Sequence, residues 1–172
     1  MLLGMSLRTF TIVHVVISLI GIIGGVVAVG LWTRGRNNPL WTSVFLLTTL
    51  LTSVSGFMFP FVKVTPGIIV GVISVAVLAL AFAASSAGHL NGAWRGIYVA
   101  SCVAALYFNC FVLVVQSFQK IPPLHALAPT EKEPPFAITQ LVLLVAFVAL
   151  WWKADKGFHI GGPAAVAAAK AR

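Results

Sequence analysis

Two amide side chains, Asn109 and Gln116, lie within an apolar run that is long enough to cross a bilayer. In hydrocarbon an amide costs free energy unless it finds a hydrogen-bond partner, so such side chains face other helices or a water-filled cavity. On a helix that advances about 100° per residue, Ser101, Ala105, Asn109 and Gln116 share one narrow face. We therefore expect this face to point into a bundle of helices.

The other strongly polar side chains of the apolar runs are expected at a similar depth. If successive runs cross the membrane in alternating directions, His14 lies near the start of the first run, and Thr52 and Ser55 lie near the end of the second. Gln140 lies near the start of the last run. The sequence thus predicts a polar pocket within one leaflet, formed by His14, Thr52, Ser55, Asn109, Gln116 and Gln140.

The same cluster has a simpler interpretation, which is a set of interhelical hydrogen bonds that fixes the packing. Each such bond contributes about 1 kcal/mol or less. None of these side chains is acidic or permanently charged, and among them only His14 titrates. The sequence leaves both interpretations open, a ligand pocket and a packing cluster.

The elements that position these residues follow from the composition of the chain. It is 60% hydrophobic and 8% charged, whereas a soluble domain is about half apolar and about a quarter charged. Roughly 20 apolar residues span a bilayer, and by this measure we predict spans at residues 9–32, 41–61, 67–89, 94–118 and 136–152. The ends of these runs carry the tryptophans, whose indole rings prefer the headgroup layer: Trp32, Trp41, Trp94, Trp151 and Trp152.

These spans are predicted to be helices, because in lipid the backbone must satisfy its own hydrogen bonds. The expected fold class is all-α, an integral membrane bundle of five transmembrane helices over residues 1–153. The first run is too long for the apolar region of a signal peptide, so we expect it to be retained. The proline-rich segment Lys120–Phe136 is expected to cap the membrane surface, and residues 154–172 to form a disordered basic tail.

The net charge of +8 raises the question of nucleic-acid binding. The basic residues lie at the ends of the apolar runs rather than on one polar face, so we exclude nucleic acid and expect contact with lipid headgroups. Their distribution favours, by a small margin, an N-terminus outside and a C-terminus in the cytoplasm. Gly21 and Gly25 form a small-xxx-small pair, which is compatible with packing inside the chain or with a homo-oligomer.

Several classes of protein are disfavoured by what the spans lack. The acidic residues Glu131, Glu133 and Asp155 all lie outside them, whereas ion-coupled transporters usually keep a carboxylate within the membrane. The sequence has no nucleotide-binding loop, zinc-protease motif or Cys-x-x-Cys. It therefore favours a non-enzymatic role without a cofactor.

Part of the sequence resembles a known group of proteins. The pattern N-x-x-x-L-V-V-Q at residues 109–116 is followed by a loop that ends in E-P-P-F. This region (105–144), together with HLNGAWRGIYV and SVSGFMFPF, is similar to small multi-pass bacterial membrane proteins to which no function is assigned. The resemblance implies a bacterial inner membrane and brings no activity, substrate or cofactor.

The function that these observations favour is binding of a small neutral or amphiphilic ligand, such as a lipid or quinone-like headgroup, or of a membrane partner. One alternative is a small channel or facilitator formed by an oligomer. A second alternative is a redox subunit that carries haem b. His14 and His89 are expected near opposite faces of the membrane and cannot share one haem. The haem iron would therefore have to be bound by His14 and His125.

Overall fold

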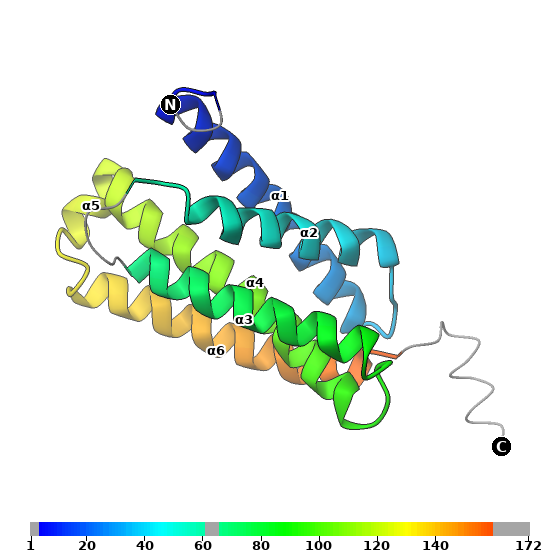
Figure 1. Ribbon diagram of the computed structural model, residues 1–172. Helices are drawn as coiled ribbons and strands as arrows, with labels where there is room; N and C mark the ends of the chain where they lie inside the picture. Colours follow the sequence, from blue (N-terminus) through cyan, green and yellow to red (C-terminus); the bar gives the residue numbers. More distant parts are fainter. Residues whose placement is uncertain (1–3, 61–65, 160–172) are drawn as a thin grey trace, which may run out of the picture.

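The computed structural model describes residues 4–60 and 66–159 (Figure 1). Helices make up its regular structure, and this part of the chain contains no strand. In chain order the helices are α1 (Leu7–Trp32), α2 (Pro39–Gly56), α3 (Pro66–Ser86), α4 (Ala93–Lys120), α5 (Pro122–Leu127) and α6 (Pro134–Gly157). The predicted all-α bundle is confirmed.

All of these helices except α5 are long and apolar enough to cross a membrane, which makes five candidate spans. The protein is therefore a multi-pass membrane protein. Two boundaries differ from those expected. Helix α2 ends at Gly56, and α6 continues to Gly157, so the residues just after 153 extend a helix instead of starting a tail. Residues 160–172, which carry the rest of the predicted tail, lie outside the described part of the chain.

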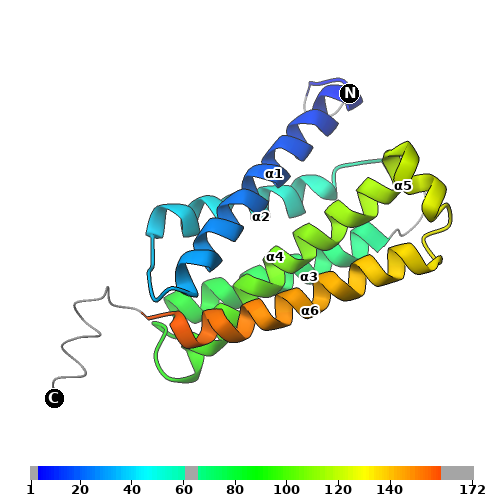
Figure 2. The same cartoon turned by 180° about the vertical axis from the view of Figure 1, so that it is seen from behind.

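Helix α4 is the centre of the bundle, because it contacts each of the other helices. Helices α3 and α6 lie along it, and α1 pairs with α2 (Figures 1 and 2). The two views also show that the N-terminal half of α1 diverges from α4 and α6. The bundle is therefore closed at one end and splayed at the other.

The closed end contains the core. Here the buried side chains of the C-terminal parts of α1, α3 and α6 meet the N-terminal parts of α2 and α4. Trp32, Tyr98 and Phe158 form an aromatic cluster, with ring centroids of Trp32 and Phe158 4.8 Å apart. The Arg95 guanidinium donates to the backbone oxygens of Asp155 at 2.6 Å and Phe158 at 3.0 Å. These contacts attach the end of α6 to the beginning of α4.

Glycines allow α1 to approach α2 closely. Gly24 lies against the backbone of Phe45, because a Cβ built on it would stand 3.3 Å from the Phe45 nitrogen. A Cβ on Gly25 would stand 2.6 Å from Leu106 Cδ1 and 2.8 Å from the Phe45 ring. Both side chains are fully buried. The small residues of α1 therefore serve packing within the chain.

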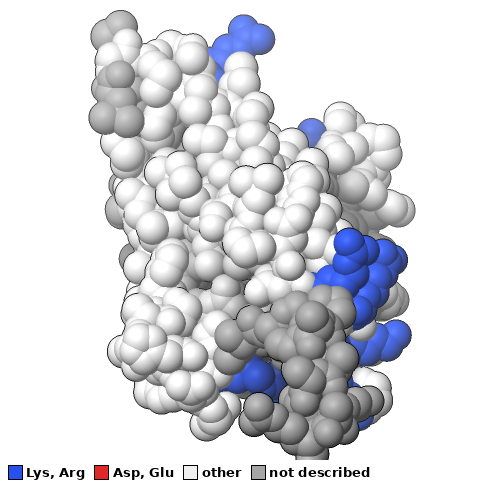
Figure 3. Space-filling view, turned by 90° about the vertical axis from the view of Figure 1, so that its right-hand side faces the viewer, with Lys and Arg blue, Asp and Glu red and all other residues white. Residues whose placement is uncertain are grey.

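The closed end is also basic. Figure 3 looks at this end of the molecule and shows lysine and arginine side chains gathered there. The residues that follow α1 include Arg34 and Arg36, and the last turns of α6 include Lys153 and Lys156. The splayed half of the bundle therefore lies at the end opposite this basic one.

A substitution in α1 tests the close approach. We expect Gly25→Val to lower the free energy of unfolding by about 1–3 kcal/mol, the usual cost of overpacking a core. The matched control is Gly30→Val on the same helix, where an added Cβ meets no atom within 4 Å. Both changes alter helix propensity equally, so the difference between their midpoints of thermal unfolding in detergent isolates the packing. Equal midpoints would contradict the contact.

Candidate functional site

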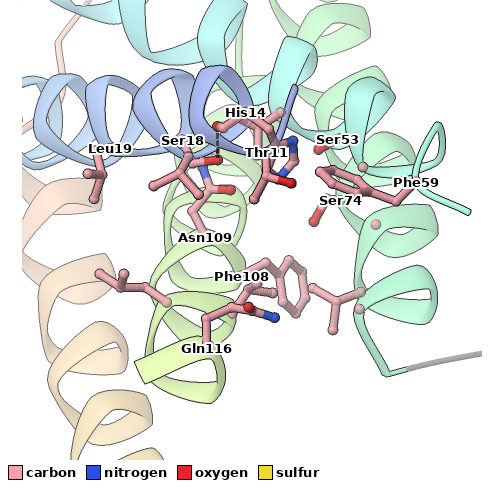
Figure 4. A pocket seen from close by; sticks show the side chains of 18 of the residues that line it. Thr11, His14, Ser18, Leu19, Ser53, Phe59, Ser74, Phe108, Asn109 and Gln116 are labelled. Atoms are coloured by element: carbon pink, nitrogen blue, oxygen red, sulfur yellow. Dashed lines mark hydrogen bonds between the residues drawn. The ribbon is translucent and has the colours of Figure 1, made fainter. Parts of the chain in front are cut away.

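A cavity of about 560 Å³ lies in the splayed half of the bundle, between α1, α2, α3 and α4 (Figure 4). Its size falls within the range of about 300–1,000 Å³ that is usual for small-molecule sites. Most of its wall is apolar, with aromatic rings from Phe57, Phe59 and Phe108. Its polar lining is Thr11, His14 and Ser18 from α1, Thr52 and Ser53 from α2, Ser74 from α3, and Asn109, Gln116, Ser117 and Lys120 from α4.

The structure brings most of the sequence-predicted site residues together. Four of the six line this cavity: His14, Thr52, Asn109 and Gln116. Ser55 is not part of the lining, but its hydroxyl oxygen lies 2.8 Å from His14 Nδ1. Gln140 is separate, because it approaches α4 from α6, where its Nε2 donates to the Phe111 carbonyl at 3.3 Å. Gln140 Oε1 is buried there without a partner among the described residues.

His14 is oriented by α2. Its Nδ1 lies 2.8 Å from Ser55 Oγ, and its ring meets Phe59 edge-on with centroids 5.1 Å apart. Ser55 Oγ also lies 2.6 Å from the Leu51 carbonyl, so the serine is held to its own helix as well as to His14. Nε2 makes no hydrogen bond to a described residue, and in a neutral imidazole one ring nitrogen is a donor and the other an acceptor. His14 therefore lines the cavity with a ring that α2 holds in place through Ser55 and Phe59.

Asn109 has a part in packing and a part in the cavity. Its Nδ2 donates to Thr49 Oγ1 at 3.0 Å, which connects α4 to α2. Thr49 is fully buried. The amide oxygen of Asn109 makes no hydrogen bond within the described part of the chain, and Figure 4 shows the side chain extending from α4 toward α1. Asn109 thus fixes two helices and leaves an acceptor free.

Several hydroxyls of the lining are satisfied by their own helices. Thr11, Ser18, Ser53 and Ser117 donate to carbonyls four residues earlier, at 2.8, 2.7, 3.0 and 2.7 Å. Such bonds make hydroxyls inexpensive in an apolar environment. These residues give the wall polarity without needing a ligand.

Other polar groups of the lining have no partner. Ser74 is only 4% exposed, and its hydroxyl makes no hydrogen bond to any described residue. Thr52 Oγ1 is buried and unpartnered. The Gln116 amide also makes no hydrogen bond to the described residues, and it lies about two turns along α4 from Asn109. Gln116 is half-buried, whereas a buried oxygen such as Thr52 Oγ1 usually has a partner, so its lack of one requires an explanation.

Ser74 and Lys120 are the lining residues of most consequence that sequence reasoning missed. Ser74 follows Gly67 and Gly71 at helical spacing, so these small residues form one stripe on α3 that faces the cavity. Lys120 follows Gln116 by one helical turn and shares its face. Helical spacing from residues already identified was the signal that could have found both.

The charge of the lining is simple. Lys120 is its one permanently charged residue, and no carboxylate of the described chain belongs to it. The described residues also contain no group of three histidine, cysteine or acidic side chains that could hold a metal ion. The cavity therefore offers hydrogen bonds and one positive charge at its edge.

Comparisons with models of known protein families, with curated proteins and with solved structures found no match. The chemistry of the cavity is therefore the basis on which a function can be proposed.

The two amides should contribute differently to stability. Asn109→Leu removes the bond to Thr49, and we expect it to lower the free energy of unfolding by about 1 kcal/mol. Gln116→Leu removes no hydrogen bond to a described residue, so we expect no loss of stability. Unfolding of both variants in mixed micelles provides the measurement. A loss for Gln116→Leu as large as that for Asn109→Leu would show that Gln116 serves packing.

Proposed function

We propose that the protein is a non-catalytic membrane component that binds a small amphiphilic molecule in the cavity between α1 and α4. The observation that carries this proposal is the set of unpartnered polar groups within an otherwise apolar cavity of ligand size. Thr52 Oγ1 is buried without a partner, and the Ser74 hydroxyl and the half-buried Gln116 amide make no hydrogen bond within the described residues.

A cluster that served packing alone would satisfy its members. The Asn109–Thr49 and His14–Ser55 pairs do so. The Thr52, Ser74 and Gln116 side chains are not paired in this way, and a buried polar atom without a partner, such as Thr52 Oγ1, costs about 1–3 kcal/mol. The polar head of a ligand could supply the missing partners, and its apolar part would lie against the aromatic and aliphatic wall.

The shape of the bundle supports access from the lipid phase. Val15 and Leu19 of α1 and Leu113 of α4 line the cavity, yet they are 44%, 40% and 40% exposed. Val15 and Leu19 belong to the N-terminal half of α1, which diverges from α4 (Figure 2). An amphiphile dissolved in the leaflet could therefore reach the cavity sideways, without first entering water.

The distribution of charge supports an orientation. The basic closed end suits the cytoplasmic side, since short cytoplasmic loops carry an excess of lysine and arginine. The C-terminus would then be cytoplasmic, and the cavity would open in the outer leaflet. We propose a bacterial inner membrane as the location.

A cavity-filling variant tests the proposal. We expect Ser18→Phe to weaken binding of 1-palmitoylglycerol, a neutral single-chain amphiphile, by at least about tenfold, which corresponds to about 1.4 kcal/mol. The hydroxyl of Ser18 bonds only to its own helix, so no contact between helices is lost. Native mass spectrometry of the protein in a non-ionic detergent, titrated with this lipid, provides the measurement.

The matched control is Ser86→Phe. Ser86 also donates to a carbonyl four residues earlier, at 2.7 Å, but it lies at the exposed end of α3 outside the cavity. We expect it to bind as the unchanged protein does. Equal affinities for Ser18→Phe and Ser86→Phe would refute binding in this cavity.

A further inference from the structure

We propose that the amphiphile carries an acidic head, a carboxylate or a phosphate monoester, and that Lys120 pairs with it at the mouth of the cavity. This inference rests on the proposed function and adds the chemical class of the ligand.

Lys120 carries a charge that the described chain leaves unneutralised. It lies in the last turn of α4 and lines the cavity. The acids nearest in sequence have other partners, because Glu131 Oε1 accepts from Gln119 Nε2 at 2.7 Å and Glu133 Oε1 from Thr130 Oγ1 at 2.7 Å. The one ion pair of the described residues joins Arg95 and Asp155 at the opposite end of the bundle.

Hydrogen-bond donors line the cavity together with Lys120, in the part that we call its mouth. The side-chain amide of Gln116 lies one turn before Lys120 on α4, and Gly67 and Ile68 line the cavity from the first turn of α3. Gly67 and Gln116 also border a smaller adjoining hollow together. The first N–H groups of a helix lack intrahelical acceptors, and the helix dipole favours an anion there. The mouth thus combines a cation, an amide donor and a helix N-terminus.

The interior supplies an independent sign that the cavity holds a ligand. Ser74 is 4% exposed and unpartnered within the described chain, and it lies two turns deeper on α3 than Gly67. Figure 4 shows its hydroxyl facing the cavity across from Asn109. A carboxylate or phosphate at the mouth would pair with Lys120. Its ester group or chain would extend inward and reach Ser74.

The lining argues against the other charge classes. A cationic head would meet Lys120 without any carboxylate to offset the repulsion. A neutral head would leave the lysine without a partner, although a lysine at a membrane surface can also extend to bulk headgroups. The cavity encloses about 560 Å³, which suits one acyl chain better than a two-chain phospholipid. A single-chain acidic amphiphile meets all of these conditions.

The test compares three ligands with the same chain: palmitate, 1-palmitoyl lysophosphatidate and neutral 1-palmitoylglycerol. Each is titrated into the full-length protein in a non-ionic detergent, and native mass spectrometry measures occupancy. We expect the two acidic lipids to bind about tenfold more tightly than palmitoylglycerol, because a hydrogen bond between charged groups is about twice as strong as a neutral one. Acetate and inorganic phosphate are added as competitors that lack the chain.

The variants are Lys120→Gln and, as a matched control on the same side of the membrane, Lys132→Gln. Lys132 is exposed and does not line the cavity. We expect Lys120→Gln to weaken binding of the two acidic lipids until they bind no more tightly than palmitoylglycerol, and Lys132→Gln to keep the preference.

Three outcomes would overturn the inference while leaving the proposed function in place. The first is equal binding of acidic and neutral lipids by the unchanged protein. The second is an equal loss of preference in both lysine variants, which would indicate a diffuse surface charge. The third is displacement of lysophosphatidate by free phosphate, which would indicate a site for simple anions. Failure of every lipid to bind would refute the proposed function as well.

Discussion

Trp32 at the end of α1, Tyr98 near the beginning of α4 and Phe158 just after α6 form one buried aromatic cluster. Arg95, close to Tyr98 in the sequence, donates to two carbonyls at the end of α6. Together with the glycines of α1, these contacts hold the helices at one end of the bundle. Because α1 is attached there, its other half can diverge from α4 without unfolding the chain. The cavity depends on this asymmetry, since a bundle packed evenly along its length would have filled it.

The fold could be predicted from the sequence because the bilayer sets strong constraints. The length of the apolar runs and the tryptophans at their ends located the five long helices to within a few residues. The predicted span ended five residues before the end of α6, because the last turns of this helix contain charged residues. Lys153 and Lys156 face outward, whereas Ala154 and Phe158 are buried in the core. A hydropathy average cannot separate two faces of one helical turn.

The site was predicted in part for the same reason. Depth in the membrane placed His14, Thr52, Asn109 and Gln116 in one leaflet, and they line one cavity. The depth of Gln140 in the membrane could not predict its position around α4. Two residues at the same depth can approach α4 from different sides. Gln140 bonds to the backbone of α4 from the side of α6. Ser74 was missed because a single hydroxyl in an apolar run is cheap in lipid and gives no signal by itself.

The polar groups of the splayed half divide by how their hydrogen bonds are made. Hydroxyls such as Ser18 and Ser53 bond to their own helices, and Asn109 and Ser55 bond across helices. What remains unpaired is Thr52 Oγ1 on α2, Ser74 on α3, and Gln116 and Lys120 on α4. Helix α1 contributes Thr11 and Ser18, whose hydroxyls bond to their own helix, and His14, whose Nδ1 is paired with Ser55. A polar head would therefore find its partners on α2, α3 and α4, whereas α1 would contribute mainly the apolar side chains Val15, Leu19 and Ile22 to the wall around its chain.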